Sequence, residues 1–355
     1  MDTILTLVII AIVAIWVMGR RYAGEDHARY DEPQDELLIK PEDISPQHDD
    51  TVARLASFHE QSMTKTAAAR RRMEELFFQE VDAEIRPVDV DGIPSEWVLA
   101  PGADPDRRLL YLHGGAFRVG SPRSHRYITA ELSKRAGVAV LAIDYRMLPE
   151  HRIVACHEDA RTAYAWILEH GPAGDTPPAD LYVAGDSAGG NLTLAVIAWA
   201  RDQGLRPANA AIGLAPATDG TFGSKTWKTN IDTDPFLGPS IGRMMKMPRP
   251  LLLIMQRFGS GAAPNDPMLS PIHGRLDGLP PILIQASRDE LLYGDIQRYA
   301  NKAREAGTSV TLQLWPKLVH VFHGFGPDLP EAVDALDRIA GFIASNRSVK
   351  EAAAG

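Results

Sequence analysis

The stretch Gly185-Asp186-Ser187-Ala188-Gly189-Gly190 follows the apolar run 181–184 and precedes the largely apolar segment 192–200. It is a G-x-S-x-G pattern between an expected strand and an expected helix, where glycines permit a sharp turn that holds the serine hydroxyl above a sheet. The first amides of the helix would favour a developing anion. The stretch predicts a nucleophile, Ser187, with Asp186 beside the substrate. A glycine-rich turn without chemistry is the structural alternative.

Outward from this turn, short apolar runs alternate with helical patterns. This alternation predicts an α/β fold, with a mostly parallel eight-stranded sheet and helices on both faces. Ligands then bind outside the carboxyl ends of the strands. The expected strands cover 86–90, 95–100, 107–113, 137–145, 180–186, 208–216, 281–287 and 309–315, and the expected helices 124–137, 156–171, 187–204, 294–307 and 330–345.

A long interruption of the alternation, 218–268, contains many methionines and predicts a helical cap over the site, in which Trp227 and Phe236 would contact the substrate. The same reasoning divides the chain into an apolar N-terminal helix over 1–24, an N-terminal cap or linker over 25–80, and a catalytic domain over 81–350.

A second motif, His113-Gly114-Gly115-Ala116-Phe117, directly follows the expected strand 107–113. Acyl transfer needs hydrogen-bond donors at the point where a carbonyl oxygen becomes an oxyanion. Two glycines allow backbone amides to approach that atom, so the amides of Gly114, Gly115 and Ala188 are the expected donors. Phe117 is an expected substrate contact, and His113 is expected to be a structural hydrogen-bonding group.

An acid and a base must complete the site. Asp289 follows the expected strand 281–287, and His320 follows the expected strand 309–315, so both should reach the sheet edge that carries Ser187. His320 would accept the proton of Ser187, and Asp289 would orient the imidazole. Glu290 and Asp295 are alternative acids, and His323 is the alternative base.

Taken together, these motifs resemble those of the bacterial hormone-sensitive-lipase-like esterases of the α/β-hydrolase superfamily, in the branch with a GDSAG elbow. The resemblance runs from about 109 to 343 and rests on HGGAF, IDYRMLPEH, GDSAGGNL, DELLYGD and WPKLVHVFHGF. It implies an α/β-hydrolase fold, with Asp289 as the acid and His320, which follows Trp315, as the base.

The resemblance implies hydrolysis of short- to medium-chain acyl esters through an acyl-enzyme, without a metal or an organic cofactor. A lactone hydrolase or a small-metabolite deacetylase with the same triad is an alternative, and so is a triacylglycerol lipase. A ligand receptor on an inactive scaffold is a further alternative, but such a receptor should lack a triad residue, and Ser187, Asp289 and His320 are all present.

The N-terminus carries an uncharged apolar run, 3–19, followed at once by Arg20 and Arg21. As a helix this run would extend roughly 25 Å, near the lower limit for crossing a bilayer. The charge order differs from that of a cleaved signal peptide. We expect an uncleaved anchor with a cytoplasmic catalytic domain, because basic residues remain on the cytoplasmic side. A helix packed on the cap or within a homodimer is the alternative.

The amino-acid composition excludes some classes of binding partner. A net charge of −9 argues against nucleic acid, which requires clustered Lys and Arg. The expected partners are therefore a small-molecule ester and, through the N-terminal segment, a membrane. The single cysteine, Cys156, excludes an intrachain disulfide and is expected to be a buried apolar residue and not a thiol nucleophile.

Overall fold

A nine-stranded sheet forms the centre of the molecule, in the order β1-β9-β8-β7-β6-β4-β5-β3-β2. The structure, a computed structural model, describes residues 2–39, 44–60 and 66–348. Pairing is parallel except where β3 joins β2 and β5. The strands are β1 (Glu36–Leu38), β2 (Glu84–Val90), β3 (Ile93–Leu99), β4 (Asp104–Leu112), β5 (Val138–Ile143), β6 (Asp180–Asp186), β7 (Ala210–Leu214), β8 (Ile282–Ser287) and β9 (Val310–Trp315).

The expectation of an α/β-hydrolase fold with a mostly parallel sheet is confirmed, whereas the count of eight strands was one too few. The additional strand, β1, has only three residues and lies in the segment expected to be a linker or cap. It pairs in parallel with β9, Leu37 opposite Gln313. So short a strand has little apolar periodicity of its own and depends on its neighbour for pairing.

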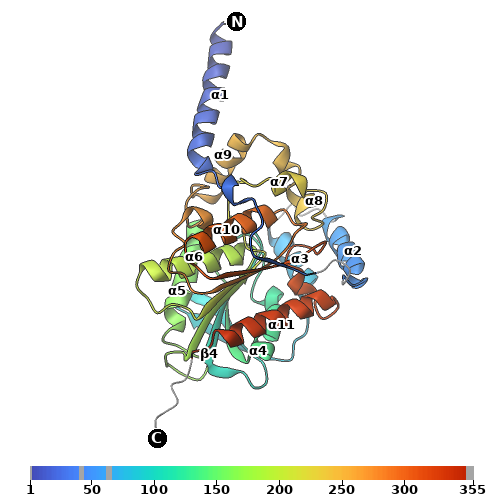
Figure 1. Cartoon of the computed structure of the whole chain (residues 1–355), viewed down its shortest axis with the longest axis vertical. Coiled ribbons are helices and arrows are strands. Elements are labelled where there is room, and N and C mark those ends of the chain that lie inside the picture. The colour runs from blue at the N-terminus through green and yellow to red at the C-terminus, as the bar shows by residue number, and fades with distance from the viewer. Residues whose placement is uncertain (1, 40–43, 61–65, 349–355) are drawn as a thin grey trace.

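Helices cover both faces of the sheet (Figure 1). On one face, α5, α6 and α10 contribute Tyr164, Leu192 and Ile296 to the larger core cluster. On the other, α4 and α11 contribute Leu132 and Ile339 to a second cluster. The covering helices are α4 (Arg126–Ala136), α5 (Ile153–Ile167), α6 (Ala188–Asp202), α10 (Tyr293–Glu305) and α11 (Pro330–Ser345).

Strands β5, β6, β7 and β8 are buried along their whole length, as expected for continuous apolar runs between two helical layers. Local signals explain the helix ends. Helix α4 stops at Gly137, whose φ of 64° is left-handed, and α11 begins with Pro330 in its first turn. The carboxyl ends of the parallel strands consequently meet at one edge of the sheet.

A cap of short helices lies beyond that edge (Figure 1). Part of it comes from the N-terminal region and part from the long interruption after β7. Phe58, Phe77 and Phe236 from the two parts pack with Trp315 and Phe322 of the catalytic domain. The cap helices are α2 (Gln47–Glu60), α3 (Thr66–Phe77), α7 (Thr226–Thr229), α8 (Leu237–Ile241) and α9 (Arg249–Ser260).

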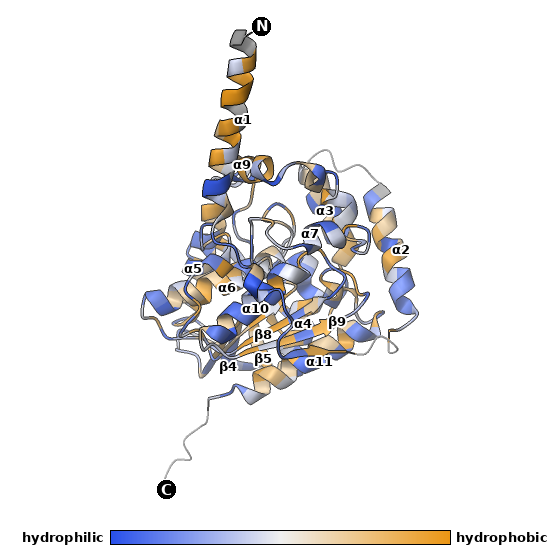
Figure 2. Cartoon of the chain, turned by 45° about the horizontal axis from the view of Figure 1, so that its top comes forward, coloured by the Kyte–Doolittle hydropathy of each residue, from blue (hydrophilic) through white to orange (hydrophobic). Residues whose placement is uncertain are grey.

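The first helix, α1 (Asp2–Ala23), projects away from the body on the side of the cap (Figures 1 and 2). One stretch of it, Leu5–Ala23, is long and apolar enough to cross a membrane. Its large side chains are exposed, among them Leu5, Ile10 and Trp16. The remaining short elements are single 3-10 turns: η1 (Ala28–Tyr30), η3 (Arg123–His125), η4 (Met244–Lys246), η5 (Pro271–His273) and η6 (Phe322–Phe325).

Candidate active site

Ser187 lies in a strained turn between β6 and α6. Its φ of 51° falls in the left-handed region that non-glycine residues seldom adopt. The turn is tight because Gly189 lies against β4: a Cβ atom there would lie 1.8 Å from the carbonyl oxygen of Leu112. The sequence G-D-S-A-G therefore has glycine where the backbone of another strand approaches. The strain holds the serine hydroxyl above the sheet edge.

His320 reaches Ser187 from the loop after β9. Its Nε2 atom lies 2.9 Å from Ser187 Oγ, the distance of a hydrogen bond that could carry a proton. The next residue, Val321, has a φ of 53°, which is unfavourable for a β-branched side chain and marks a second strained turn. The structure thus brings together the predicted nucleophile and the predicted base.

The carboxylate behind His320 belongs to Glu290 and not to Asp289. Glu290 is fully buried, its Oε1 lies 3.2 Å from His320 Nδ1, and its Oε2 accepts the amide of Ser287. Asp289 is only partly buried, and its carboxylate accepts the amide of Lys317. The structure therefore contradicts the expectation that Asp289 orients the imidazole. The turn after β8 directs the two neighbouring side chains to opposite sides, and Glu290 faces inward.

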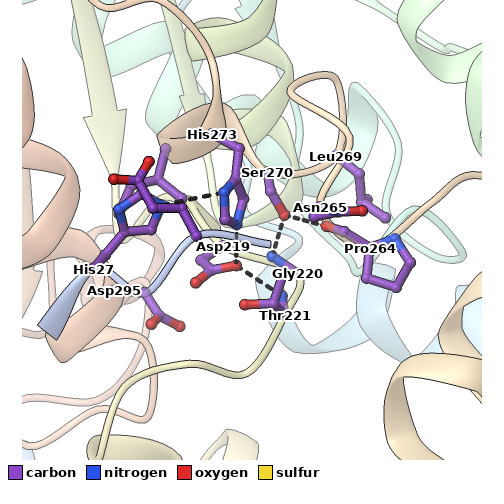
Figure 3. A network of polar contacts seen from close by, with 12 residues as sticks. His27, Asp219, Gly220, Thr221, Pro264, Asn265, Leu269, Ser270, His273 and Asp295 are labelled. Atoms are coloured by element: carbon purple, nitrogen blue, oxygen red, sulfur yellow. Dashed lines mark hydrogen bonds and ion pairs between the residues drawn. The ribbon is translucent and has the colours of Figure 1, made fainter. Parts of the chain in front are cut away.

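Asp295, the other alternative acid, belongs to a separate polar network beside the cap (Figure 3). It accepts the indole N–H of Trp227 at 2.5 Å and the amide of Ser224. Burial, and then the charge of Asp219, raise the pKa of Asp295 to about 8. The same network contains His273, which lies between Asp219 and His27. Asp295 therefore supports the Trp227 side chain and does not contact His320.

Asp186, beside the nucleophile, braces the loop that carries the HGGA motif. Its Oδ1 accepts Tyr111 Oη at 2.7 Å and the Gly114 amide at 2.9 Å, and His125 Nε2 lies 3.3 Å from Oδ2. Burial opposes its charge, but His125 and then Tyr111 outweigh this, and the pKa of Asp186 is lowered. Although Asp186 borders a cavity, its oxygens are occupied by protein donors. Its geometry indicates a bracing role in place of the expected substrate contact.

The amide of Gly114 is therefore not available to an oxyanion, contrary to expectation. Gly114 is a glycine for another reason: a Cβ atom there would lie 2.0 Å from Asp186 Oδ2. The next two amides, of Gly115 and Ala116, have no hydrogen-bond acceptor among the described residues, and both residues border the cavities at Ser187. Ala188 is the first residue of α6, so its amide has no acceptor within the helix.

The other candidate histidines lie apart from the nucleophile. His113 Nδ1 lies 2.8 Å from the Gly114 carbonyl oxygen, and the ring stacks on Tyr145. His323 Nε2 lies 3.0 Å from Gln285 Oε1. Burial lowers the pKa of each of these two histidines to about 3, so both are neutral at physiological pH. They act as hydrogen-bonding groups within the core.

The pKa of His320 differs from those of these neighbours. Burial alone would lower it, but the charge of Glu290 and the hydrogen bond to it raise the pKa above the usual value for histidine. For Glu290 the effect of burial has the opposite sign: burial raises the pKa of its carboxyl group, and His320 opposes that shift. The pairing favours the imidazolium that a base forms when it takes a proton from Ser187.

Two adjoining cavities meet at Ser187. One, of about 410 Å³, contains Phe117, Trp227 and Asn191 in its wall. The other, of about 370 Å³, contains His320 and Phe236. The three expected aromatic contacts, Phe117, Trp227 and Phe236, thus all border the space around the nucleophile. Within the described parts of the chain, no group of three or more His, Cys, Asp or Glu side chains is arranged to hold a metal ion.

Comparison with known proteins identifies the family. Residues 109–324 match a family described as having the α/β hydrolase fold. An acetyl-hydrolase of Streptomyces hygroscopicus is 38% identical over 72% of this chain and 81% of that protein. A carboxylesterase/phospholipase of Mycobacterium tuberculosis is 33% identical over 72% of this chain and 68% of that protein. A solved esterase of the bacterial hormone-sensitive lipase family superposes with a TM-score of 0.76 and 32% identity, covering 86% of this chain and 99% of that one.

The chain therefore belongs to the α/β-hydrolase family, within the group that resembles hormone-sensitive lipase. It is an ester hydrolase, as its relatives are. Two residues that the geometry places at the site differ from those expected from the sequence. Glu290 was ranked below its neighbour, and Ala116 was passed over although it occupies the position after the two glycines of the HGGA motif.

Proposed function

We propose that Ser187, His320 and Glu290 form a catalytic triad that hydrolyses short- to medium-chain carboxylic esters through an acyl-enzyme. The observation that carries this proposal is the continuous line of contacts from Ser187 Oγ to His320 Nε2 and from His320 Nδ1 to Glu290. Glu290 takes the role expected of Asp289, because it is the carboxylate that can fix the tautomer of the imidazole.

In the first half of the reaction, Ser187 Oγ bonds to the ester carbonyl carbon while its proton moves to His320 Nε2. The carbonyl oxygen becomes an oxyanion facing the amides of Gly115, Ala116 and Ala188. The bond to the alcohol oxygen then breaks, and His320 returns the proton to that oxygen. In the second half, water gives a proton to His320 while its oxygen bonds to the acyl carbon. The bond between that carbon and Ser187 Oγ then breaks, His320 returns the proton to Oγ, and the carboxylic acid leaves.

The two cavities have different roles in this mechanism. The departing alcohol must lie near His320, which protonates it, so the cavity of about 370 Å³ that contains His320 holds the alcohol. The acyl group then occupies the cavity of about 410 Å³ beside Asn191 and Trp227. Both volumes are at the lower end of the range for ligand sites, which favours compact acyl groups.

Chain length tests this proposal. Affinity should rise by about 0.8 kcal/mol for each methylene buried until the acyl cavity is full. We expect kcat/KM on p-nitrophenyl esters from acetate to palmitate to be highest at acyl chains of about two to eight carbons. A maximum at twelve carbons or longer would contradict the esterase proposal and favour a lipase.

The same triad could also open a lactone or remove an acetyl group from nitrogen. A panel containing an ester, a lactone and an N-acetyl compound of equal size would separate these reactions. Acetyl esters have specific support, because the acetyl-hydrolase of Streptomyces hygroscopicus is among the relatives. We expect the ester to be hydrolysed with the highest kcat/KM, and the reverse ranking would assign the site to the lactone or the amide.

We further propose that α1 is an uncleaved anchor and that Arg20 and Arg21 keep the catalytic domain on the cytoplasmic side. The support is the length and exposure of the apolar stretch Leu5–Ala23. Full-length protein should sediment with membranes and resist carbonate extraction. Deletion of residues 1–24 should release a soluble enzyme that still hydrolyses small esters. Recovery of a mature protein that lacks α1 would identify a signal sequence instead.

A further inference from the structure

Helix α9 exposes apolar side chains on its outer face. Met255 and Phe258 are three positions apart and lie on the same side of the helix, where Met255 is 47% exposed and Phe258 is 78% exposed. Leu253, on the opposite side of the helix, is buried, and so is Leu252. An outward-facing phenylalanine at this exposure, beside a second apolar side chain, is unusual for a surface in contact with water only.

This helix lies against the end of the proposed anchor (Figures 1 and 2). A Cβ atom at Gly19 would lie 2.4 Å from Pro250 Cβ, so the backbone of α1 lies directly against Pro250 in the first turn of α9. Just beyond, Asn265 Nδ2 donates to the carbonyl oxygen of Arg21. The first turn of α9 is therefore level with Arg20 and Arg21, which would lie among the lipid head groups if α1 crosses the bilayer.

The charges around α9 match an anionic surface. Between Pro235 and Asn265 the sequence contains no Asp or Glu, although the chain as a whole has a net charge of −9. The same stretch contains the cations Arg243, Lys246, Arg249 and Arg257. Three of them, Arg243, Lys246 and Arg249, are exposed. Basic and apolar side chains together are typical of helices that lie in the interface of a membrane.

The inner face of α9 forms part of the acyl cavity. Leu252, Gln256 and Ser260 belong to the wall of the cavity of about 410 Å³. Met255 and Gly259 border the same cavity and are also exposed. One helix thus separates the cavity at Ser187 from the surface that lies next to the anchor.

We propose that the outer face of α9 docks on the anionic bilayer that holds α1, so that the enzyme takes esters dissolved in that bilayer directly into the cavity behind α9. This inference rests on the proposed anchor and deepens the proposed esterase function by naming its substrate class, esters that partition into membranes. Phe258 enters the interface, while Arg243 and Lys246 contact lipid phosphates. The guanidinium of Arg249 donates to Thr221 and holds the start of α9 on the cap.

A site-specific label tests the docking. Cys156 is buried, so a cysteine introduced by F258C is the accessible thiol and can carry an environment-sensitive fluorophore. The matched control is K134C, at an exposed position in the last turn of α4, just before β5 begins, and therefore at the opposite edge of the sheet. Full-length protein is reconstituted into phosphatidylcholine vesicles with or without phosphatidylglycerol, and nitroxide lipids serve as the quencher.

We expect the label at position 258 to be quenched and blue-shifted, more strongly with phosphatidylglycerol, while the label at 134 stays unquenched. Equal quenching at the two positions would overturn the docking. A blue shift at position 258 in a dimer in lipid-free detergent would assign the face to a second copy of this chain. Failure of the protein to float with vesicles would overturn the docking and the anchor together, while the esterase proposal would stand if p-nitrophenyl acetate is still hydrolysed.

Activity provides a second, independent test. Phe258 does not border either cavity, so F258D should leave hydrolysis of water-soluble p-nitrophenyl acetate unchanged. On p-nitrophenyl octanoate dissolved in anionic vesicles, the rate should fall about tenfold, because loss of the apolar side chain weakens docking. F258W should retain the rate. F78D changes another exposed phenylalanine, outside α9, and should alter neither rate. Equal effects of F258D and F78D on the vesicle substrate would overturn the proposal.

Discussion

The catalytic edge of the sheet and the cap above it are built by different means. At the edge, residues with positive φ hold the functional groups, namely Ala116, Phe117, Ser187 and Val321. Buried charged side chains there have specific partners, as Asp186 has in Tyr111 and His125. The cap consists of short helices whose apolar and basic side chains reach the surface. We infer that residues at the edge determine the reaction, whereas residues of the cap determine which ester reaches and fits the cavities.

If the catalytic edge of the sheet determines the reaction, a substitution there should lower the turnover of every substrate by the same factor. S187A should reduce kcat by about 10⁴- to 10⁶-fold on acetate and octanoate esters, since it removes the atom that forms the acyl-enzyme. H320A should be as severe, and the double variant little worse than either, because triad residues act as a unit.

H323A is the matched control for the base, since His323 is equally buried but contacts Gln285. We expect it to cost far less activity than H320A. The reverse ranking of the two histidine variants, measured by kcat on p-nitrophenyl acetate, would transfer the role of base to His323.

The neighbouring carboxylates provide the next test. In E290Q the amide can donate to His320 Nδ1 and favour the tautomer that cannot accept the proton of Ser187, so kcat should fall by about 10²- to 10⁴-fold. D289N should change kcat less than about threefold, because Asp289 is only partly buried and contacts the amide of Lys317, not His320. E290D should retain more activity than E290Q. A larger loss of kcat in D289N than in E290Q would assign the role of the triad carboxylate to Asp289.

The pH profile sharpens the assignment. His320 acts as a base only when neutral, and its pKa is raised by Glu290. We expect kcat/KM to rise with pH through a pKa above that of an ordinary histidine, about 6.5, and to fall about tenfold for each unit below it. In E290Q the negative charge is absent, so the acidic limb of the profile should move to lower pH. If the acidic limb of E290Q stays at the same pH, Glu290 does not raise the pKa of His320.

The smallest expected effect concerns the cap. Met244 borders only the cavity assigned to the acyl group, and Ser240 borders only the cavity assigned to the alcohol. M244W should lower kcat/KM for the octanoate ester about tenfold relative to the acetate ester, because one or two methylenes lose their place in the cavity. S240W should leave this ratio unchanged and instead disfavour larger alcohols. An opposite pattern would exchange the roles of the two cavities.

Much of the fold and part of the site could be predicted from the sequence. Ser187 and His320 follow long apolar strands, and parallel strands must end at a common edge, so their meeting follows from the pattern. The choice between Asp289 and Glu290 could not be made in this way, because adjacent residues on a turn point in different directions that only the folded backbone determines. The amide of Gly114 was assigned wrongly because its partner, Asp186, is distant in sequence.

The short strand β1 has a consequence for how far the chain can be trimmed. It pairs with β9 along Leu312 and Leu314, and the amide of Ile39 donates to the Leu314 carbonyl oxygen. Without it, β9 would present unpaired backbone groups at the border of the sheet, where another molecule could add its own strand. Removal of α1 alone leaves this border covered. Removal of residues through 39 would keep every catalytic group, yet produce an enzyme prone to self-aggregation.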